Sequence, residues 1–115
     1  MLTRLGKGSF GEVYSAKRKS NNKLFAVKFE KYDPSRETKV CLEAHLLGKL
    51  KGSRYVTKVH VAKSETFGKG SSAGKYYYII MDLLGSSLND LFKAASKKFD
   101  ARTCCLVGQN MIRAI

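Results

Sequence analysis

A glycine-punctuated run near the N-terminus constrains the fold of this chain more than any other feature. Residues 6–13, GKGSFGEV, fit the pattern G-x-G-x-x-G-x-V through Gly6, Gly8 and Gly11. Glycine has no side chain, so a backbone built this way can approach a bound anion closely through its N–H groups. The pattern is also typical of a glycine-rich hairpin without a ligand, so the sequence that follows must decide between the two interpretations.

The residues after Gly11 favour a strand and exclude a dinucleotide-binding unit. That unit needs a helix directly after the glycine turn and an acidic residue about 20 positions further on. Glu30 satisfies the spacing, but Val13 and Tyr14 lead into a charged turn over 17–23, with no helical stripe. The glycines are therefore predicted to lie on a strand-turn-strand flap.

The second predicted strand, 24–30, carries a lysine in a characteristic setting. Its sequence Phe-Ala-Val-Lys fits the V-A-I-K strand, which places an ammonium group on nucleotide phosphates. By alternation Ala26 and Lys28 share one face of the strand. The opposite face carries Phe25, Val27 and Phe29. A solvated lysine on an edge strand is the alternative, and the more common situation for any lysine.

A helix is predicted from Asp33-Pro34-Ser35 to about Leu50, with Glu37 in its first turn and Gly52 as the stop. Its predicted core-facing stripe contains Leu46, Leu47 and Leu50. Extending that stripe backwards by three and four residues gives Glu43. A buried carboxylate needs a partner, because an unpaired buried charge is very costly. The spacing therefore predicts an ion pair between Lys28 and Glu43.

The rest of the chain predicts two more strands, a linker and two helices. The strands are expected over 55–62 and 76–81, the loop between them over 63–75, the linker over 82–87, and the helices over 88–95 and 100–115. Asp100 is the expected N-cap of the last helix, whose apolar residues recur at steps of three or four. That helix has no closing glycine, and the sequence stops within it.

Composition limits the class of protein. The 115 residues, 43% of them hydrophobic, are enough for about one domain, and a net charge of +13 indicates an anionic partner. Three cysteines without paired spacing predict a reduced protein of the cytoplasm, the nucleus or both. The longest apolar run, 76–81, is too short to cross a bilayer, so no membrane partner is expected.

Several other motifs are better explained structurally. The segment 70–75 resembles a P-loop but has Lys69 where the first glycine is needed. Cys104 and Cys105 point in different directions on a helix and have no second pair, so no metal site is predicted. His45 and His60 lack a matching nucleophile or ligand set and are assigned structural roles.

Taken in order, the glycine run, Lys28 and Glu43 resemble the N-terminal lobe of a eukaryotic protein kinase. The stretch 81–92, MDLLGSSLNDLF, is similar to the hinge and following helix of the casein kinase 1 group, and the helix around Glu43 is similar to its tau-tubulin kinase branch. The resemblance implies an α+β fold: a five-stranded antiparallel sheet with one packed helix (1–81), a hinge (82–87), and two helices that begin a truncated C-terminal lobe (88–115).

The resemblance also implies a nucleotide site, with ATP as the cofactor. In this family pattern Met81 would be the gatekeeper, Asp82 would accept and Leu84 would donate a backbone hydrogen bond to adenine, and Asp90 would lie near the ribose. The roof of the pocket would be Leu5, Val13 and Ala26, and the phosphates would lie under Gly6, Gly8 and Gly11, with Lys28 held by Glu43. Asp82 replaces the family's usual Glu, which matters little if only its backbone binds the base.

The departures from the family pattern concern catalysis. The sequence contains no His-Arg-Asp and no Asp-Phe-Gly motif, and no Asp follows Asp100. Those motifs supply the base and the magnesium ligands of phosphoryl transfer, so the 115 residues alone are expected to be catalytically incompetent, with Mg²⁺ bound only alongside the missing ligands. The loop over 64–75 is longer than usual in the group.

Three functions therefore remain open at the level of sequence. The first is the ATP-binding portion of a casein kinase 1-like Ser/Thr kinase whose substrates are acidic or pre-phosphorylated proteins. The second is a short non-catalytic module that binds a nucleotide or a partner. The third is a basic nucleic-acid binder, which is disfavoured because the basic residues are dispersed and Tyr76, Tyr77 and Tyr78 read more simply as a core strand.

Overall fold

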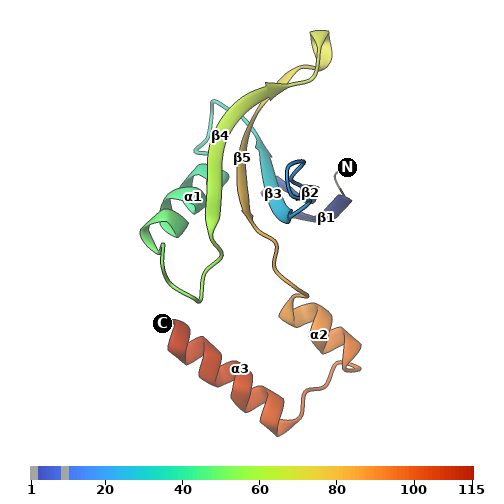
Figure 1. Cartoon of the computed structure of the whole chain (residues 1–115), viewed down its shortest axis with the longest axis vertical. Helices are drawn as coiled ribbons and strands as arrows, with labels where there is room; N and C mark the ends of the chain where they lie inside the picture. The colour runs from blue at the N-terminus through green and yellow to red at the C-terminus, as the bar shows by residue number, and fades with distance from the viewer. Residues whose placement is uncertain (1–2, 9–10) are drawn as a thin grey trace. The chain divides into compact units, whose positions relative to one another are not determined.

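The structure is a computed structural model that describes residues 3–8 and 11–115. It contains one antiparallel sheet of five strands in the order β1-β2-β3-β5-β4 (Figure 1). The strands are β1 (Thr3–Gly8), β2 (Gly11–Lys17), β3 (Leu24–Lys31), β4 (Val59–Phe67) and β5 (Gly74–Asp82). The helices are α1 (Lys39–Lys49), α2 (Leu88–Ala94) and α3 (Ala101–Ala114), with a short 3-10 turn η1 (Gly70–Ser72). The predicted α+β architecture is confirmed.

The chain divides into two compact units. The first ends at Leu84 and contains the sheet and α1, and the second, Gly85–Ile115, contains α2 and α3. Strand β5 continues through Asp82, the first residue of the predicted hinge. Among the described residues, no helix is long and apolar enough to cross a membrane.

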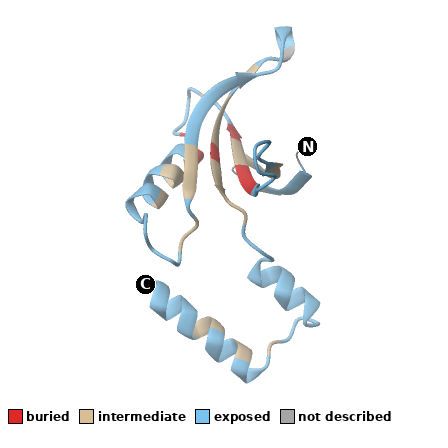
Figure 2. Ribbon diagram, in the orientation of Figure 1, coloured by how far each residue is buried: buried red, intermediate tan, exposed pale blue. Residues whose placement is uncertain are grey.

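The core of the first unit occupies both faces of the central strands, and α1 covers the face that carries Ala26. Helix α1 packs against β3, β4 and β5, and Figure 2 shows buried residues on α1 and on the central strands β3 and β5. The most buried hydrophobic side chains are Phe25, Ala26, Val27, Val40 and Ile79. Val40 is the only one of these on the helix, so the first turn of α1 is its most deeply packed part.

The start of α1 was predicted too early. Residues 33–38 are not helical, because the Asp33 carboxylate accepts bonds from both the backbone N–H (2.9 Å) and the hydroxyl (2.6 Å) of Ser35 and closes a local turn. Helix α1 begins at Lys39, after the N-cap Thr38, so Glu37 is not in its first turn.

The inward stripe of α1 also differs from the prediction. Leu46 and Leu50 are about half exposed, at 50% and 52%. The positions that are buried or half-buried are Val40, Glu43, Ala44 and Leu47. Only Leu47 of the three predicted leucines belongs to this stripe, whereas Glu43 lies on it as expected.

Strand β4 begins and ends later than the sequence indicated. The predicted strand over 55–62 and loop over 63–75 are replaced by a strand that starts at Val59 and reaches Phe67. Polar residues such as Lys63 and Glu65 mislead the prediction because β4 is an edge strand, where exposed polar side chains are normal. The Tyr78 hydroxyl donates to Glu65 across the pair at 3.0 Å.

The two helices of the second unit are capped by side chains. The Asp100 carboxylate accepts the Thr103 N–H at 2.7 Å, so the predicted N-cap of α3 is confirmed. At the start of α2, Ser87 and Asp90 form a reciprocal capping box.

Candidate functional site

Lys28 and Glu43 form the ion pair that the sequence predicts. The Lys28 Nζ atom lies 2.5 Å from Glu43 Oε2, joining β3 to α1. The two side chains are partly shielded, with exposed fractions of 23% and 35%. An ammonium group held in this way is fixed in place yet remains open on one side to an anionic ligand.

The strand register brings three more candidate residues to the same face as Lys28. Val13 of β2 lies opposite Lys28, and Ala26 of β3 lies opposite Met81 of β5. Because directly opposed residues share a face of a sheet, these four side chains lie on the side that α1 partly covers. Ala26 is buried, while Val13 and Met81 are half-buried. The face offers small and apolar groups beside one cation.

The glycines of the N-terminal run differ in whether the fold itself requires them to be glycine. A Cβ added to Gly11 would lie 2.0 Å from the Phe29 carbonyl oxygen, and φ there is +134°, so the sheet itself requires glycine. A Cβ at Gly6 would meet nothing within 4 Å, so the space above this strand is open. Gly8 pairs with Gly11. The tip between them, residues 9–10, lies outside the described residues.

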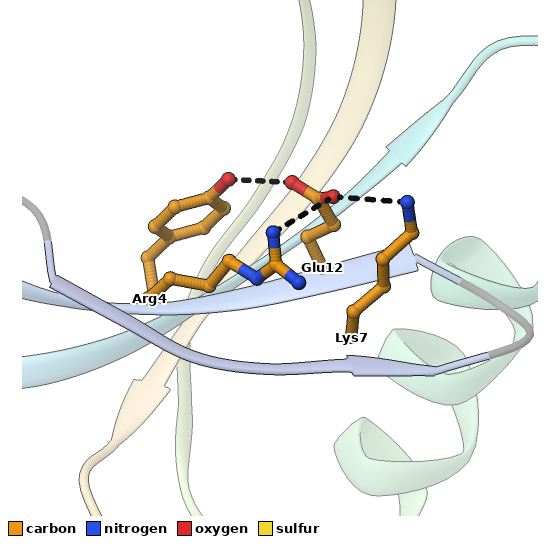
Figure 3. Close-up of polar contacts among 4 residues, drawn as sticks. Arg4, Lys7 and Glu12 are labelled. Carbon is orange, nitrogen blue, oxygen red and sulfur yellow. Dashed lines mark hydrogen bonds and ion pairs between the residues drawn. The ribbon is translucent and has the colours of Figure 1, made fainter.

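A cluster of charges lies on the other face of β1 and β2. Figure 3 shows Arg4 and Lys7 converging on the carboxylate of Glu12, at 3.9 Å and 3.6 Å. The Tyr14 hydroxyl donates to the same carboxylate at 2.5 Å, and this bond is the main cause that holds the pKa of Glu12 below its usual value. By alternation this cluster points away from Val13, so these two cations do not join Lys28.

The end of β5 is held by three polar contacts. The Asp82 N–H donates to the Lys58 carbonyl at 3.1 Å, and the Asp82 carbonyl accepts the Thr57 hydroxyl at 3.3 Å. A carbonyl oxygen has two lone pairs, so this bond leaves one acceptor position. The Asp82 carboxylate lies 2.7 Å from His60 Nε2. This hydrogen bond is the main cause that lowers the pKa of Asp82.

The remaining predicted site residues are exposed. Leu5 of β1 and Leu84 after β5 are 53% and 68% exposed. Asp90 belongs to the second unit, where its carboxylate accepts the Ser87 N–H at 3.1 Å and the Ser87 hydroxyl at 2.6 Å. These bonds lower the pKa of Asp90 and give it a structural task. Its contact with a ribose stays a prediction.

Comparison with known proteins identifies the family. The sequence model described as "Protein kinase domain" matches residues 1–115. This chain belongs to the protein kinase family. It is also similar to a probable serine/threonine-protein kinase of Dictyostelium discoideum, with 32% identity over 116 residues. That alignment covers 100% of this chain but only 22% of the relative, so the chain spans about a fifth of the relative's length.

Kinases use ATP with Mg²⁺, and the described residues fit these two groups differently. Within residues 3–8 and 11–115, no three His, Cys, Asp or Glu side chains gather as metal ligands. Cys41, Cys104 and Cys105 are free and exposed. The open Gly6 strand and the partly exposed Lys28 fit a polyphosphate, whereas no set of side chains here fits a magnesium ion.

Sequence reasoning missed one buried acid of this kinase lobe. Glu30 is only 4% exposed, and its carboxylate accepts the Val40 N–H of α1 at 2.8 Å. The sequence does contain a signal, because alternation along β3 puts Glu30 on the same face as Ala26 and Lys28. Alternation gives the face on which Glu30 lies but not its partner, so the link to Val40 of α1 emerges only from the structure.

Proposed function

We propose that this chain is the ATP-binding portion of a protein serine/threonine kinase of the casein kinase 1 group, in its tau-tubulin kinase-like branch. The observation that carries the proposal is the Lys28–Glu43 ion pair on the face that also holds Val13, Ala26 and Met81. The similarity of the stretch 81–92 to the hinge of that group supports the finer assignment.

The phosphate end of the proposed site consists of Lys28 and the glycine strands. The Glu43 carboxylate holds the Lys28 ammonium in one position, so the charge is placed before a ligand arrives. The open space above Gly6 lets the backbone of β1 lie close to phosphate oxygens. Gly8 and Gly11 would continue this cover over the phosphates.

The adenine end of the proposed site consists of apolar side chains and the last residues of β5. Leu5, Val13 and Ala26 would cover the ring, and Met81 would limit the depth of the pocket. The second lone pair of the Asp82 carbonyl and the Leu84 N–H would bind the edge of the base. Asp90 would approach the ribose.

When bound, ATP would supply the γ-phosphoryl group that is transferred to a protein hydroxyl. The residues described here would bind and orient it, but the base and the Mg²⁺ ligands of the family are not among them. We therefore propose transfer for the protein in which His-Arg-Asp and Asp-Phe-Gly motifs accompany this chain. The net charge of +13 suits acidic or pre-phosphorylated protein substrates in the cytoplasm or nucleus.

The test measures binding and transfer separately. Equilibrium titration with ATP, without and with Mg²⁺, should give saturable binding to the full chain that a single-stranded oligonucleotide does not displace. A phosphotransfer assay with an acidic serine peptide and its phosphorylated form then tests the kinase group, and it uses a protein in which His-Arg-Asp and Asp-Phe-Gly motifs follow this chain, because the 115 residues alone are not expected to catalyse transfer. Binding without transfer would favour the alternative, a non-catalytic nucleotide-binding module. Displacement by the oligonucleotide, with no ATP binding, would overturn the proposal.

A further inference from the structure

Glu30 makes an unusual contact for a charged residue. Its side chain is 4% exposed, and its Oε2 atom accepts the backbone N–H of Val40, which is 1% exposed. The bond crosses from β3 to the first turn of α1, between two of the most deeply buried residues of this lobe. Burying a carboxylate costs free energy unless the group is hydrogen-bonded, so the position of Glu30 calls for a physical explanation.

The first turn of α1 lacks the usual local solution for its backbone donors. The N-cap Thr38 makes no side-chain cap hydrogen bond, and the first turn contains no acidic residue. The N–H groups at a helix start have no partner within the helix and carry partial positive charge. Glu30 therefore supplies from β3 both the acceptor and the negative charge that a capping residue normally provides.

The positions of the two attachments define the placement of α1. Lys28 and Glu30 are two residues apart and share a face of β3, about 7 Å from each other along the strand. Val40 and Glu43 are three residues apart and lie on the same side of the helix, with an axial rise of about 4.5 Å. Glu30 binds at Val40 and Lys28 binds at Glu43. Two contacts fix both the rotation and the axial position of a helix, which one contact cannot do.

We propose that Glu30 is a positioning residue for the Lys28–Glu43 ion pair: by holding the first turn of α1 on β3, it keeps Glu43 within reach of Lys28. The proposal rests on the proposed function in that the ion pair serves nucleotide phosphates. A cap that only stabilised the helix could come from any neighbouring residue of the helix itself. Glu30 acts from the strand that also carries Lys28, so it ties the helix to the lysine.

The experiment measures the reactivity of Lys28 in the full chain without nucleotide. Lysines are labelled with an amine-reactive acetylating reagent, and the rate at Lys28 is read by mass spectrometry against exposed Lys31 of the same strand. The variant Glu43→Gln gives the acetylation rate of Lys28 when its ion pair with residue 43 is lost. Glu30→Gln keeps the reach and an acceptor oxygen but loses the charge, whereas Glu30→Asp keeps the charge but loses one methylene of reach. Glu30→Leu/Thr38→Asp gives the helix its own cap without the link to β3.

The expected result separates reach from charge and from simple capping. Glu30→Gln should label at Lys28 within about twofold of the wild type, while Glu30→Asp and the double variant should label at least about threefold faster, approaching Glu43→Gln. Wild-type protection of Lys28 in the folded double variant would reduce Glu30 to a helix cap and overturn the proposal. If Glu30→Asp does not fold, the double variant alone decides.

The readout is independent of nucleotide binding. Should the wild-type chain fail to bind ATP while the labelling pattern holds, the proposed function falls and the positioning role of Glu30 stands. If ATP binds and the labelling rate of Lys28 is the same in every Glu30 variant, the positioning role of Glu30 falls and the proposed function stands.

Discussion

Lys28 and Glu43 are separated by fifteen residues and belong to different elements, yet their charged atoms lie 2.5 Å apart. The exposed fractions of 23% and 35% leave both groups partly solvated. Partly exposed ion pairs contribute little to folding stability, because water already solvates each charge and holding two long side chains in place costs entropy. The physical effect of this pair is therefore mainly to hold an ammonium group in one position.

Lys28→Met should lower the affinity for ATP by at least about tenfold, because it removes the charge nearest the proposed phosphates. The free energy of unfolding should change by less than about 1 kcal/mol, since Glu43 remains partly hydrated. Calorimetric titration and urea unfolding measure the two quantities. Lys31→Met, an exposed lysine of the same strand, is the matched control and should leave the affinity unchanged. Unchanged affinity in Lys28→Met would remove this lysine from the site.

Gly11→Ala should destabilise the fold by at least about 2 kcal/mol, because φ is +134° and the new Cβ would lie 2.0 Å from the Phe29 carbonyl oxygen. Gly6→Ala is the matched comparison, since its Cβ would meet nothing within 4 Å. It should change the free energy of unfolding by no more than about 1 kcal/mol and should instead weaken ATP binding. Equal destabilisation by the two substitutions would contradict the distinction between them.

The accuracy of the sequence-based predictions depends on the range of the interactions involved. Alternation along β3 places Lys28 correctly, and the helical period brings Glu43 to the inward stripe, because both follow from local geometry. The capping box of α2 is equally local, since Ser87-x-x-Asp90 is a short motif that the sequence alone displays.

The features that were missed depend mainly on contacts between separate elements. The start of α1 is preceded by a local turn at Asp33, but the helix itself is held by Glu30, which reaches Val40 from β3. The start of β4 is set by pairing with β5, where the Lys58 carbonyl accepts the Asp82 N–H. Periodicity carries no record of such partners, so it extends helices and strands as far as residue type allows.

Asp82 should make the stability of the sheet sensitive to acid. Its pKa lies below the ordinary value of 3.8, chiefly because of the bond to His60. A carboxyl group with a lowered pKa stabilises the folded state fully above its unfolded value, and this contribution is lost as the pH falls through the lowered value. The difference in unfolding midpoint between wild type and Asp82→Asn should therefore shrink between about pH 5 and pH 2. A difference that is constant over that range would exclude this contribution of the Asp82 carboxylate.

Ser87→Ala and Asp90→Ala together separate the structural task of Asp90 from its proposed contact with ATP. Ser87→Ala removes the hydroxyl that accepts the Asp90 N–H at 3.1 Å, so the helical population of α2 should fall by about fivefold while the Asp90 carboxylate remains. NMR chemical shifts of Leu88–Ala94 measure that population, and titration with ATP measures affinity. Asp90→Ala should lower helicity to a similar extent and, if the proposed contact with the ribose is made, weaken ATP binding further. If both variants weaken binding equally, Asp90 acts only through the cap.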